Sequence, residues 1–209
     1  MASSDVDRIH REFTELVAFL ADKGEISMQS AADDAFRKVL IISAASYFEH
    51  ELTNIVTAFV DEVASSDALV TALVHNKAVS RQYHTWFSWD EKNANRFFAL
   101  FGEEFKTHMR DVVKGSPGLD QAIKAFLELG DGRNRLAHQN FAAFALEKTS
   151  QEIYKLYQDA LPFIHSVRDE LRACSTKLRS VSAVQTPEAD VPGARPSGMD
   201  QLGSGTDQE

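Results

Sequence analysis

The chain has little of what marks several common protein classes. It contains one cysteine, Cys174, in 209 residues, which excludes an internal disulfide and a zinc site built from cysteines. Its longest apolar run, residues 39–48, is far shorter than the roughly 20 residues that a membrane-spanning helix needs. The N-terminus has no apolar segment of the signal-peptide type. These absences predict a soluble protein with no membrane partner in a reducing, cytoplasmic compartment.

Positive charge is also scarce. The chain has 22 Lys and Arg against 31 Asp and Glu, which gives a formal net charge of −9. Proteins that hold nucleic acid through many phosphates need a broad basic surface. The composition argues against such a surface, but it leaves room for a small basic pocket.

The motifs of several enzyme classes are absent as well. The sequence has no Walker loop, no dinucleotide-binding glycine fingerprint and no catalytic-serine elbow. Four histidines, His75, His84, His108 and His165, lack the spacing of metal ligands. We therefore expect neither a cofactor nor a metal.

The last part of the chain differs in composition from the rest. Residues 183–209 contain three of the five prolines, four of the ten glycines, five acidic residues and one arginine. Their few apolar residues show no period, so they cannot offset the entropy of ordering. We predict a helical domain over residues 1–182 and a disordered acidic tail over residues 183–209.

The first 182 residues carry apolar residues at helical spacing, and no alternating pattern of useful length indicates a strand. Ser4 is a plausible N-cap for the first helix, and Pro162 should bend or break the last one. Residues 65–90 are harder to assign and predict a short helix followed by a loop with Trp86 and Trp89. The other helices are predicted over residues 4–22, 30–64, 91–113, 119–129 and 149–180. The pattern indicates an all-α, up-and-down helical bundle with extra helices.

A polar stretch, "GDGRNRLAHQN", covers residues 130–140. Its two glycines predict a turn, and the arginines, Asn134 and His138 would then lie at the start of a new helix. Arg133 and His138 are five residues apart, which separates them by about 140° around a regular helix. Asn134 lies four residues before His138 and therefore on the same helix face. Without further context, such residues near a helix start are usually solvent-exposed or capping.

This stretch resembles the signature of the HEPN superfamily: an arginine, a polar residue, three further residues and a histidine. "RNRLAHQN" looks most like the RiboL-PSP-HEPN subgroup, and "ISAASYFEHEL" at residues 42–52 matches the helix that precedes the motif there. "NANRFFALFG" at residues 93–102 is also similar to the family. The resemblance covers roughly residues 30–175 and implies an all-helical fold.

The resemblance also implies metal-independent cleavage of RNA at Arg133, Asn134 and His138. A histidine titrates near neutral pH and can act as general base or acid. A guanidinium presents a planar fork that can stabilise the charge on a phosphate. The Asn134 amide can orient the imidazole or the substrate. Cleavage of this kind would leave a 2′,3′-cyclic phosphate.

Other residues are candidates for supporting roles. Glu49 lies within an apolar helix, where it could brace Arg133, or it could be an exposed acid at the helix edge. Arg37 could reach a dimer cleft, or it could extend its charge from an apolar face to solvent. Arg135 of the motif is a further candidate for RNA binding.

An aromatic segment, "SRQYHTWFSW" at residues 80–89, offers more candidates. Arg81, Tyr83 and Trp86 could contact RNA, since aromatic rings stack on unpaired bases. Such a cluster is more often part of a core or of a surface that binds a partner protein.

These inferences converge on a homodimeric endoribonuclease for single-stranded RNA. Two copies of the motif around a two-fold axis would place two arginines and two histidines in one cleft. The family's settings imply a role in phage defence or as a toxin, with an antitoxin or another defence protein as a partner. The alternative is a non-catalytic helical module that binds a partner protein.

Overall fold

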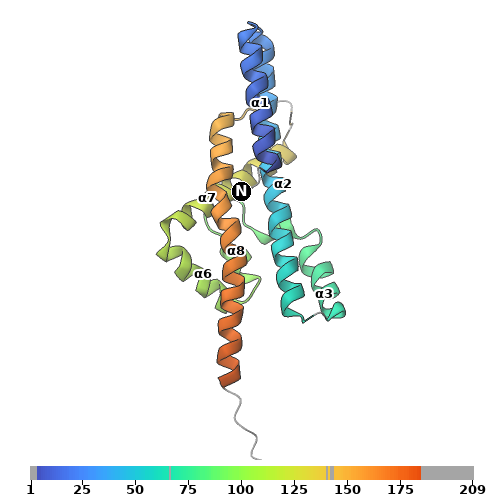
Figure 1. Cartoon of the computed structure of the whole chain (residues 1–209), viewed down its shortest axis with the longest axis vertical. Coiled ribbons are helices and arrows are strands. Elements are labelled where there is room, and N and C mark those ends of the chain that lie inside the picture. Colours follow the sequence, from blue (N-terminus) through green and yellow to red (C-terminus); the bar gives the residue numbers. More distant parts are fainter. Residues whose placement is uncertain (1–3, 66, 140, 142–143, 185–209) are drawn as a thin grey trace, which may run out of the picture.

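The computed structural model describes residues 4–184 except 66, 140, 142 and 143, and this part of the chain is helical with no strand. The predicted all-α class is therefore confirmed (Figure 1). The predicted tail lies almost wholly outside the described residues. The helices are α1 (Asp5–Asp22), α2 (Ile26–Val63), α3 (Ala68–Val74), the π-helix η1 (His75–Val79), α4 (Tyr83–Trp86), α5 (Asn95–Ala99), α6 (Glu103–Gly115), α7 (Pro117–His138) and α8 (Ser150–Val184).

The first two helices form an antiparallel hairpin. Ser4 caps α1 as predicted, because its side chain accepts a hydrogen bond from the Asp7 amide and the Asp7 carboxylate accepts one from the Ser4 amide. The turn into α2 contains Gly24, whose φ of 70° is readily available to glycine. In Figure 1 the tip of this hairpin extends above the start of α8.

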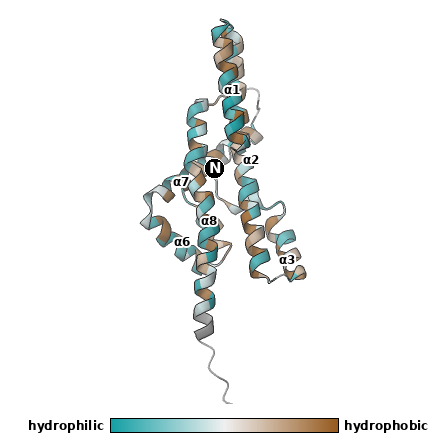
Figure 2. Ribbon diagram, viewed as in Figure 1, coloured by the Kyte–Doolittle hydropathy of each residue, from teal (hydrophilic) through white to brown (hydrophobic). Residues whose placement is uncertain are grey.

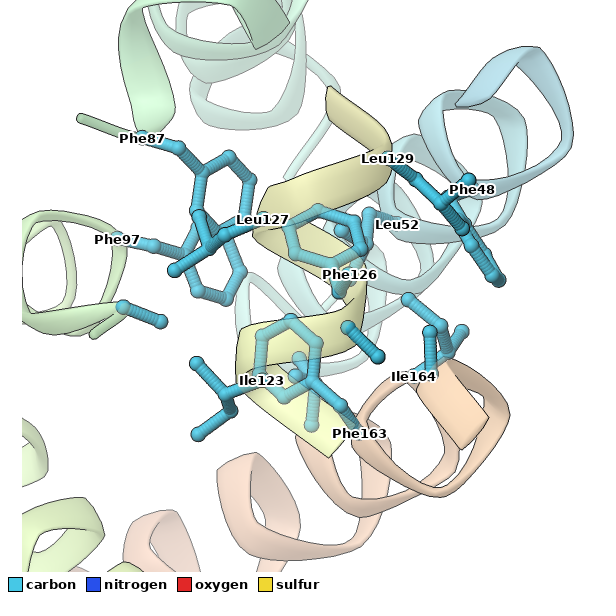
Figure 3. Close-up of a cluster of buried hydrophobic side chains, with 14 of the residues drawn as sticks. Phe48, Leu52, Phe87, Phe97, Ile123, Phe126, Leu127, Leu129, Phe163 and Ile164 are labelled. Atoms are coloured by element: carbon cyan, nitrogen blue, oxygen red, sulfur yellow. The ribbon is translucent and has the colours of Figure 1, made fainter. Parts of the chain in front are cut away.

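The core lies where α2, α7 and α8 pack together. Apolar residues at helical spacing on the facing sides of these helices bury a continuous cluster of side chains. Figure 3 shows Phe126 of α7 at its centre, with Phe48 of α2 and Phe163 of α8 nearby. Phe87, in the segment after α4, completes the cluster, and the centre of its ring lies 4.8 Å from the centre of the Phe126 ring.

The glycines of the motif region do not form a turn, and this prediction was wrong. A single helix, α7, runs from Pro117 to His138. A Cβ added at Gly130 would lie 2.0 Å from the Trp89 ring, and one at Gly132 would lie 3.5 Å from the Ile41 side chain. Gly130 therefore lacks a side chain because the Trp89 ring fills the space beside it, whereas the distance at Gly132 is an ordinary contact that leaves room for a Cβ. The packing outweighs the cost of about 1 kcal/mol for a glycine inside a helix.

The helix predicted over residues 91–113 is divided into α5 and α6. Gly102 at the junction has a φ of 97°, a conformation that other residues rarely adopt. Leu100, which follows α5, is 55% exposed.

Other boundaries differ less from expectation. Helix α2 begins at Ile26 rather than near residue 30. Helix α8 passes through Pro162 without a break. Trp86 belongs to α4, and Trp89 lies in the following loop as predicted. Across the described ranges, no helix is long and apolar enough to cross a membrane.

Candidate functional site

The motif lies at the C-terminal end of α7, not at the start of a helix. Arg133, Asn134 and Arg135 occupy its last two turns, and His138 is its final residue. The C-terminal end of a helix presents carbonyl oxygens and a partial negative charge. Any positive potential for an anionic substrate must therefore come from side chains rather than from backbone amides.

Arg133 is held between two neighbours. Its Nη2 lies 3.7 Å from Oε2 of Glu49 on α2, and its Nη1 donates a 3.2 Å hydrogen bond to Oδ1 of Asn134. The predicted pairing of Glu49 with Arg133 is therefore present. The pair is not buried, however, since the two side chains are 39% and 43% exposed. The guanidinium is oriented by two partners and still accessible to a ligand.

His138 occupies a separate position. It is exposed at the end of α7, while Arg133 and Asn134 line a small hollow with Glu49. Because His138 follows Arg133 by five residues on one continuous helix, the angle of about 140° between them applies to this chain. A single subunit thus presents the two motif side chains in different directions.

Arg135 lies over an aromatic ring. Its guanidinium carbon is 5.1 Å from the centre of the Phe144 ring, a cation–π geometry. The surrounding hollow of about 230 Å³ is also lined by Glu128, Asp131 and Glu147. Carboxylates at this position offset the positive charge of Arg135, so its role as an RNA contact stays a prediction.

Arg37 is engaged within the fold. Its Nη1 donates to the Leu146 carbonyl at 2.9 Å, and its Nε lies 3.2 Å from Oδ2 of Asp33. Asp34 forms a second ion pair with it at 3.3 Å. The two aspartates belong to α2 and orient the guanidinium, while the hydrogen bond to Leu146 joins α2 to the segment before α8. These contacts occupy the guanidinium that we expected either at a dimer cleft or in solvent.

Tyr83 and Trp86 are buried, which favours the interpretation of this cluster as part of the core over stacking on RNA bases. Tyr83 is 8% exposed and Trp86 2% exposed, and the two rings pack against each other. Burial raises the pKa of the Tyr83 hydroxyl, as does the nearby Glu49 carboxylate, whereas Arg133 lowers it. Tyr83 also lines the small hollow beside Glu49, Arg133 and Asn134, which we call the motif hollow. Arg81 is exposed, and its contact with RNA remains a prediction.

The sequence analysis missed Lys38. Its side chain is 4% exposed, pairs with Asp34 at 2.7 Å and lies 5.6 Å from the Phe141 ring, just beyond the motif. The spacing of four residues between Asp34 and Lys38 was the available signal, because such pairs face each other on a helix. The lysine brings α2 close to the segment that follows His138.

Apolar side chains lie around the motif. Val39 and Ile42 of α2 are 37% and 38% exposed, and Phe141 is 44% exposed. Ile42 lies between Lys38, which contacts Phe141, and Glu49, which pairs with Arg133, at steps of four and seven residues along one side of α2. The motif therefore has an apolar border. Among the described residues, no three His, Cys, Asp or Glu side chains form a metal-binding group.

Comparisons with known proteins assign the fold to a family. The family model described as RiboL-PSP-HEPN matches residues 7–173. Neither the search of curated proteins nor the search of solved structures finds a match. The matched range covers α1 through most of α8 and includes the whole motif. The chain belongs to the RiboL-PSP-HEPN family, whose HEPN-type domains are associated with RNase-like or nucleotide-related functions.

Proposed function

We propose that this protein is a metal-independent endoribonuclease that cleaves single-stranded RNA in a composite cleft between two subunits. The single observation that carries the proposal is the arrangement of Arg133, which is held by Glu49 and Asn134 and yet is 39% exposed. The fold therefore orients the guanidinium and leaves it able to reach a phosphate. Family membership supports the same reaction class.

The chemistry uses only side chains of the motif. A neutral His138 takes the proton from the ribose 2′-hydroxyl, whose oxygen then bonds to phosphorus. Arg133 stabilises the extra negative charge on the phosphoryl oxygens. The bond from phosphorus to the 5′-oxygen breaks, and this oxygen takes a proton from a second, protonated histidine. The products are a 2′,3′-cyclic phosphate and a free 5′-hydroxyl.

The second histidine comes from another copy of the chain. One subunit has one His138, which follows Arg133 by five residues and is therefore about 140° from it around α7. A two-fold pairing of two α7 ends would supply two arginines and two histidines to one phosphate. The exposed Val39, Ile42 and Phe141 beside the motif support a subunit contact there, because apolar area is the usual centre of such interfaces.

Incubation of the full chain with a labelled unstructured RNA in excess chelator tests the activity. We expect cleavage to continue, with cyclic phosphate at the new 3′ ends. His138→Ala should reduce the rate by at least about 100-fold, the lower range for loss of a general acid–base group, and it should leave the melting temperature unchanged because the side chain is exposed. His165→Ala, which removes another exposed helical histidine, is the matched control. Complete loss of activity in chelator, restored by magnesium, would contradict the proposal.

A partner-binding role is the second candidate. At the tip of the α1–α2 hairpin, Phe19, Ile26 and Met28 are 57%, 64% and 61% exposed. A single exposed apolar side chain is common, but several of them at one end of a hairpin favour a surface that binds a partner. An antitoxin or another defence protein could cover this tip. A chain that binds such a protein, but cleaves no RNA under any condition, would favour this second role.

A further inference from the structure

A second hollow lies apart from the motif, bounded by α2, α3, η1, α4 and α5. It measures about 350 Å³, within the range of about 300–1,000 Å³ that is typical of small-molecule sites. No residue lines both this hollow and the one beside Arg133. Helix α4 separates them, since Tyr83 borders the motif hollow and Trp86 borders the second one. Figure 2 shows hydrophobic stretches along the lower part of α2 and on α3 beside it.

The walls of this hollow are aromatic and already fixed in place. Trp86 is 2% exposed, and its indole Nε1 donates to the Ala78 carbonyl at 3.0 Å. The centres of the Trp86 and Phe97 rings are 5.7 Å apart. The Phe59 and Phe101 rings pack edge to face, with their centres 6.1 Å apart. A rigid, apolar wall of this kind favours an apolar ligand, because a polar ligand would lose its hydration without replacement.

Few polar side chains line the hollow, and the Thr85 and Trp86 side chains among them already donate to backbone carbonyls. The Thr85 hydroxyl donates to the Gln82 carbonyl at 2.8 Å. Among the described residues that line the hollow, Lys77 alone carries a charge, and it is exposed. The hollow therefore combines an apolar body with one positive group at its edge. A ligand that matches it has an apolar body and one negative group.

The backbone around Lys77 is unusual. It lies in η1, where the Ser80 amide bonds to the His75 carbonyl at 2.7 Å in the wide π-helical pattern. Arg81 follows with a φ of 58°, a left-handed conformation that is uncommon for residues other than glycine. Local π-helix and strained backbone both recur at functional sites. Here they hold the segment that carries Lys77 over the aromatic wall.

We propose that this hollow binds a small amphipathic anion, a medium-chain or aromatic carboxylate, with its apolar body against Trp86 and its carboxylate at Lys77. The inference does not depend on the ribonuclease activity. Each methylene group that the hollow buries should strengthen binding by about fourfold. Loss of the ion pair with the partly exposed lysine should weaken binding by about fivefold.

Calorimetric titration of the full chain with decanoate, below its micelle concentration, tests the site. We expect decanoate to bind up to about fivefold more tightly than decanol and about 16-fold more tightly than octanoate, and decyltrimethylammonium to bind more weakly than decanol. Lys77→Gln should remove the preference for decanoate and leave decanol binding unchanged. Lys114→Gln, which changes an exposed lysine on α6, is the matched control and should bind as the unchanged chain does.

Two further variants locate the site. Val60→Phe fills the hollow from α2 and should abolish binding of both decanoate and decanol. If Val60→Phe fails to fold, Leu100→Trp serves the same purpose. Leu100 is 55% exposed and lines the hollow, so a larger side chain there fills it from the solvent side. Absence of decanoate binding, unchanged binding by the filled variant that folds, or equal affinity of decanoate for the Lys77→Gln and unchanged chains would each overturn the proposal.

Discussion

The side chains of the motif differ in how firmly the fold holds them. Arg133 has two partners, Glu49 and Asn134, while His138 stands exposed at the helix end. A phosphate-binding arginine benefits from a fixed orientation, because its hydrogen bonds then cost less entropy. A proton-transferring histidine needs access to substrate. The exposure of each residue matches the role that we propose for it.

Replacing Glu49 separates orientation from stability. Because the pair with Arg133 is 39% and 43% exposed, we expect Glu49→Gln to reduce the free energy of unfolding by at most about 1 kcal/mol, not the roughly 3 kcal/mol of a buried pair. The cleavage rate should fall by roughly tenfold or more as the arginine loses its fixed position. Urea unfolding and single-turnover cleavage measure the two effects.

Glu62→Gln is the matched control for this experiment. It removes another exposed ion pair, with Arg172 at 3.0 Å, and it should lower stability by a similar amount without changing the cleavage rate. Equal rates for the Glu49 and Glu62 variants would show that Glu49 does not position the arginine.

At the scale of helices, α7 depends on a close approach to the aromatic segment after α4. Gly130 of α7 leaves the space that the Trp89 ring fills, and the Trp89 indole donates to the His84 carbonyl at 3.2 Å. Tyr83 packs against the same ring at 5.6 Å and borders the motif. The position of Arg133 is thus linked to the fit between these two elements.

Adding one methyl group to α7 tests this fit. Gly130→Ala would place a Cβ 2.0 Å from Trp89, and we expect it to reduce the free energy of unfolding by about 1–3 kcal/mol, as overpacking does. Gly118→Ala in the same helix has no atom within 4 Å, and it should be neutral or stabilising by up to about 1 kcal/mol. Thermal unfolding of the two variants decides the matter, and two equal melting temperatures would refute the packing explanation.

The start of α1 is attached to α8 through Asp7. Oδ1 of Asp7 accepts a hydrogen bond from the Tyr154 hydroxyl at 2.9 Å, and Oδ2 accepts one from the Ser4 amide at 2.8 Å. Partial burial raises the pKa of Asp7, but the hydrogen bonds from Ser4 and Tyr154 outweigh it and hold the pKa below its usual value. The charged carboxylate therefore stabilises the folded chain.

This lowered pKa predicts a pH dependence. The stabilisation by Asp7 should be present above its ordinary pKa of about 3.9 and be lost as the pH falls through the lower, folded value. Asp7→Asn should be less stable than the unchanged chain at pH 6, and the difference should shrink towards pH 3. Urea unfolding across this range measures it. Asp159→Asn, which alters an exposed acid of α8, should give a curve parallel to that of the unchanged chain.

At the scale of the whole molecule, the fold presents one motif per chain on an acidic protein. A net charge of −9 repels RNA at long range, so positive groups have to be concentrated locally. Two copies of Arg133 and His138 in one cleft would supply this concentration. Binding through so few phosphate contacts should be weak and should depend on salt.

Mixed dimers test whether subunits share the site. We expect Arg133→Ala and His138→Ala chains to be inactive alone and to regain a small part of the activity when mixed. A mixed dimer brings one arginine and one histidine to the cleft, so it restores phosphate stabilisation and the general base, while water has to replace the second histidine as the proton donor. Cleavage assays on the mixture, with sedimentation to record the oligomeric state, measure this. A mixture that stays inactive although mixed dimers form, or a monomer that cleaves at full rate, would contradict the shared cleft.

The sequence by itself determined the all-helical class, the capped start of α1 and the residues of the motif. Helix positions follow from the apolar period, and Ser4 with Asp7 forms a local hydrogen-bond pattern. The sequence also offered Glu49 either as a partner of Arg133 or as an exposed acid at the helix edge, and the structure has both features, because the carboxylate pairs with Arg133 and is 43% exposed. These features depend on neighbours in the chain or on residue chemistry alone.

Only the tertiary structure decided which glycines bend the chain and which aromatic rings are buried. Gly130 was predicted in a turn but lies inside α7, because Trp89, about 40 residues earlier in the chain, fills the space beside it. Trp86 was a candidate for RNA contact but packs into the core against Phe97. Arg37 bonds to the carbonyl of Leu146. Each outcome depends on a contact between distant segments, and such contacts leave no period or spacing in the sequence.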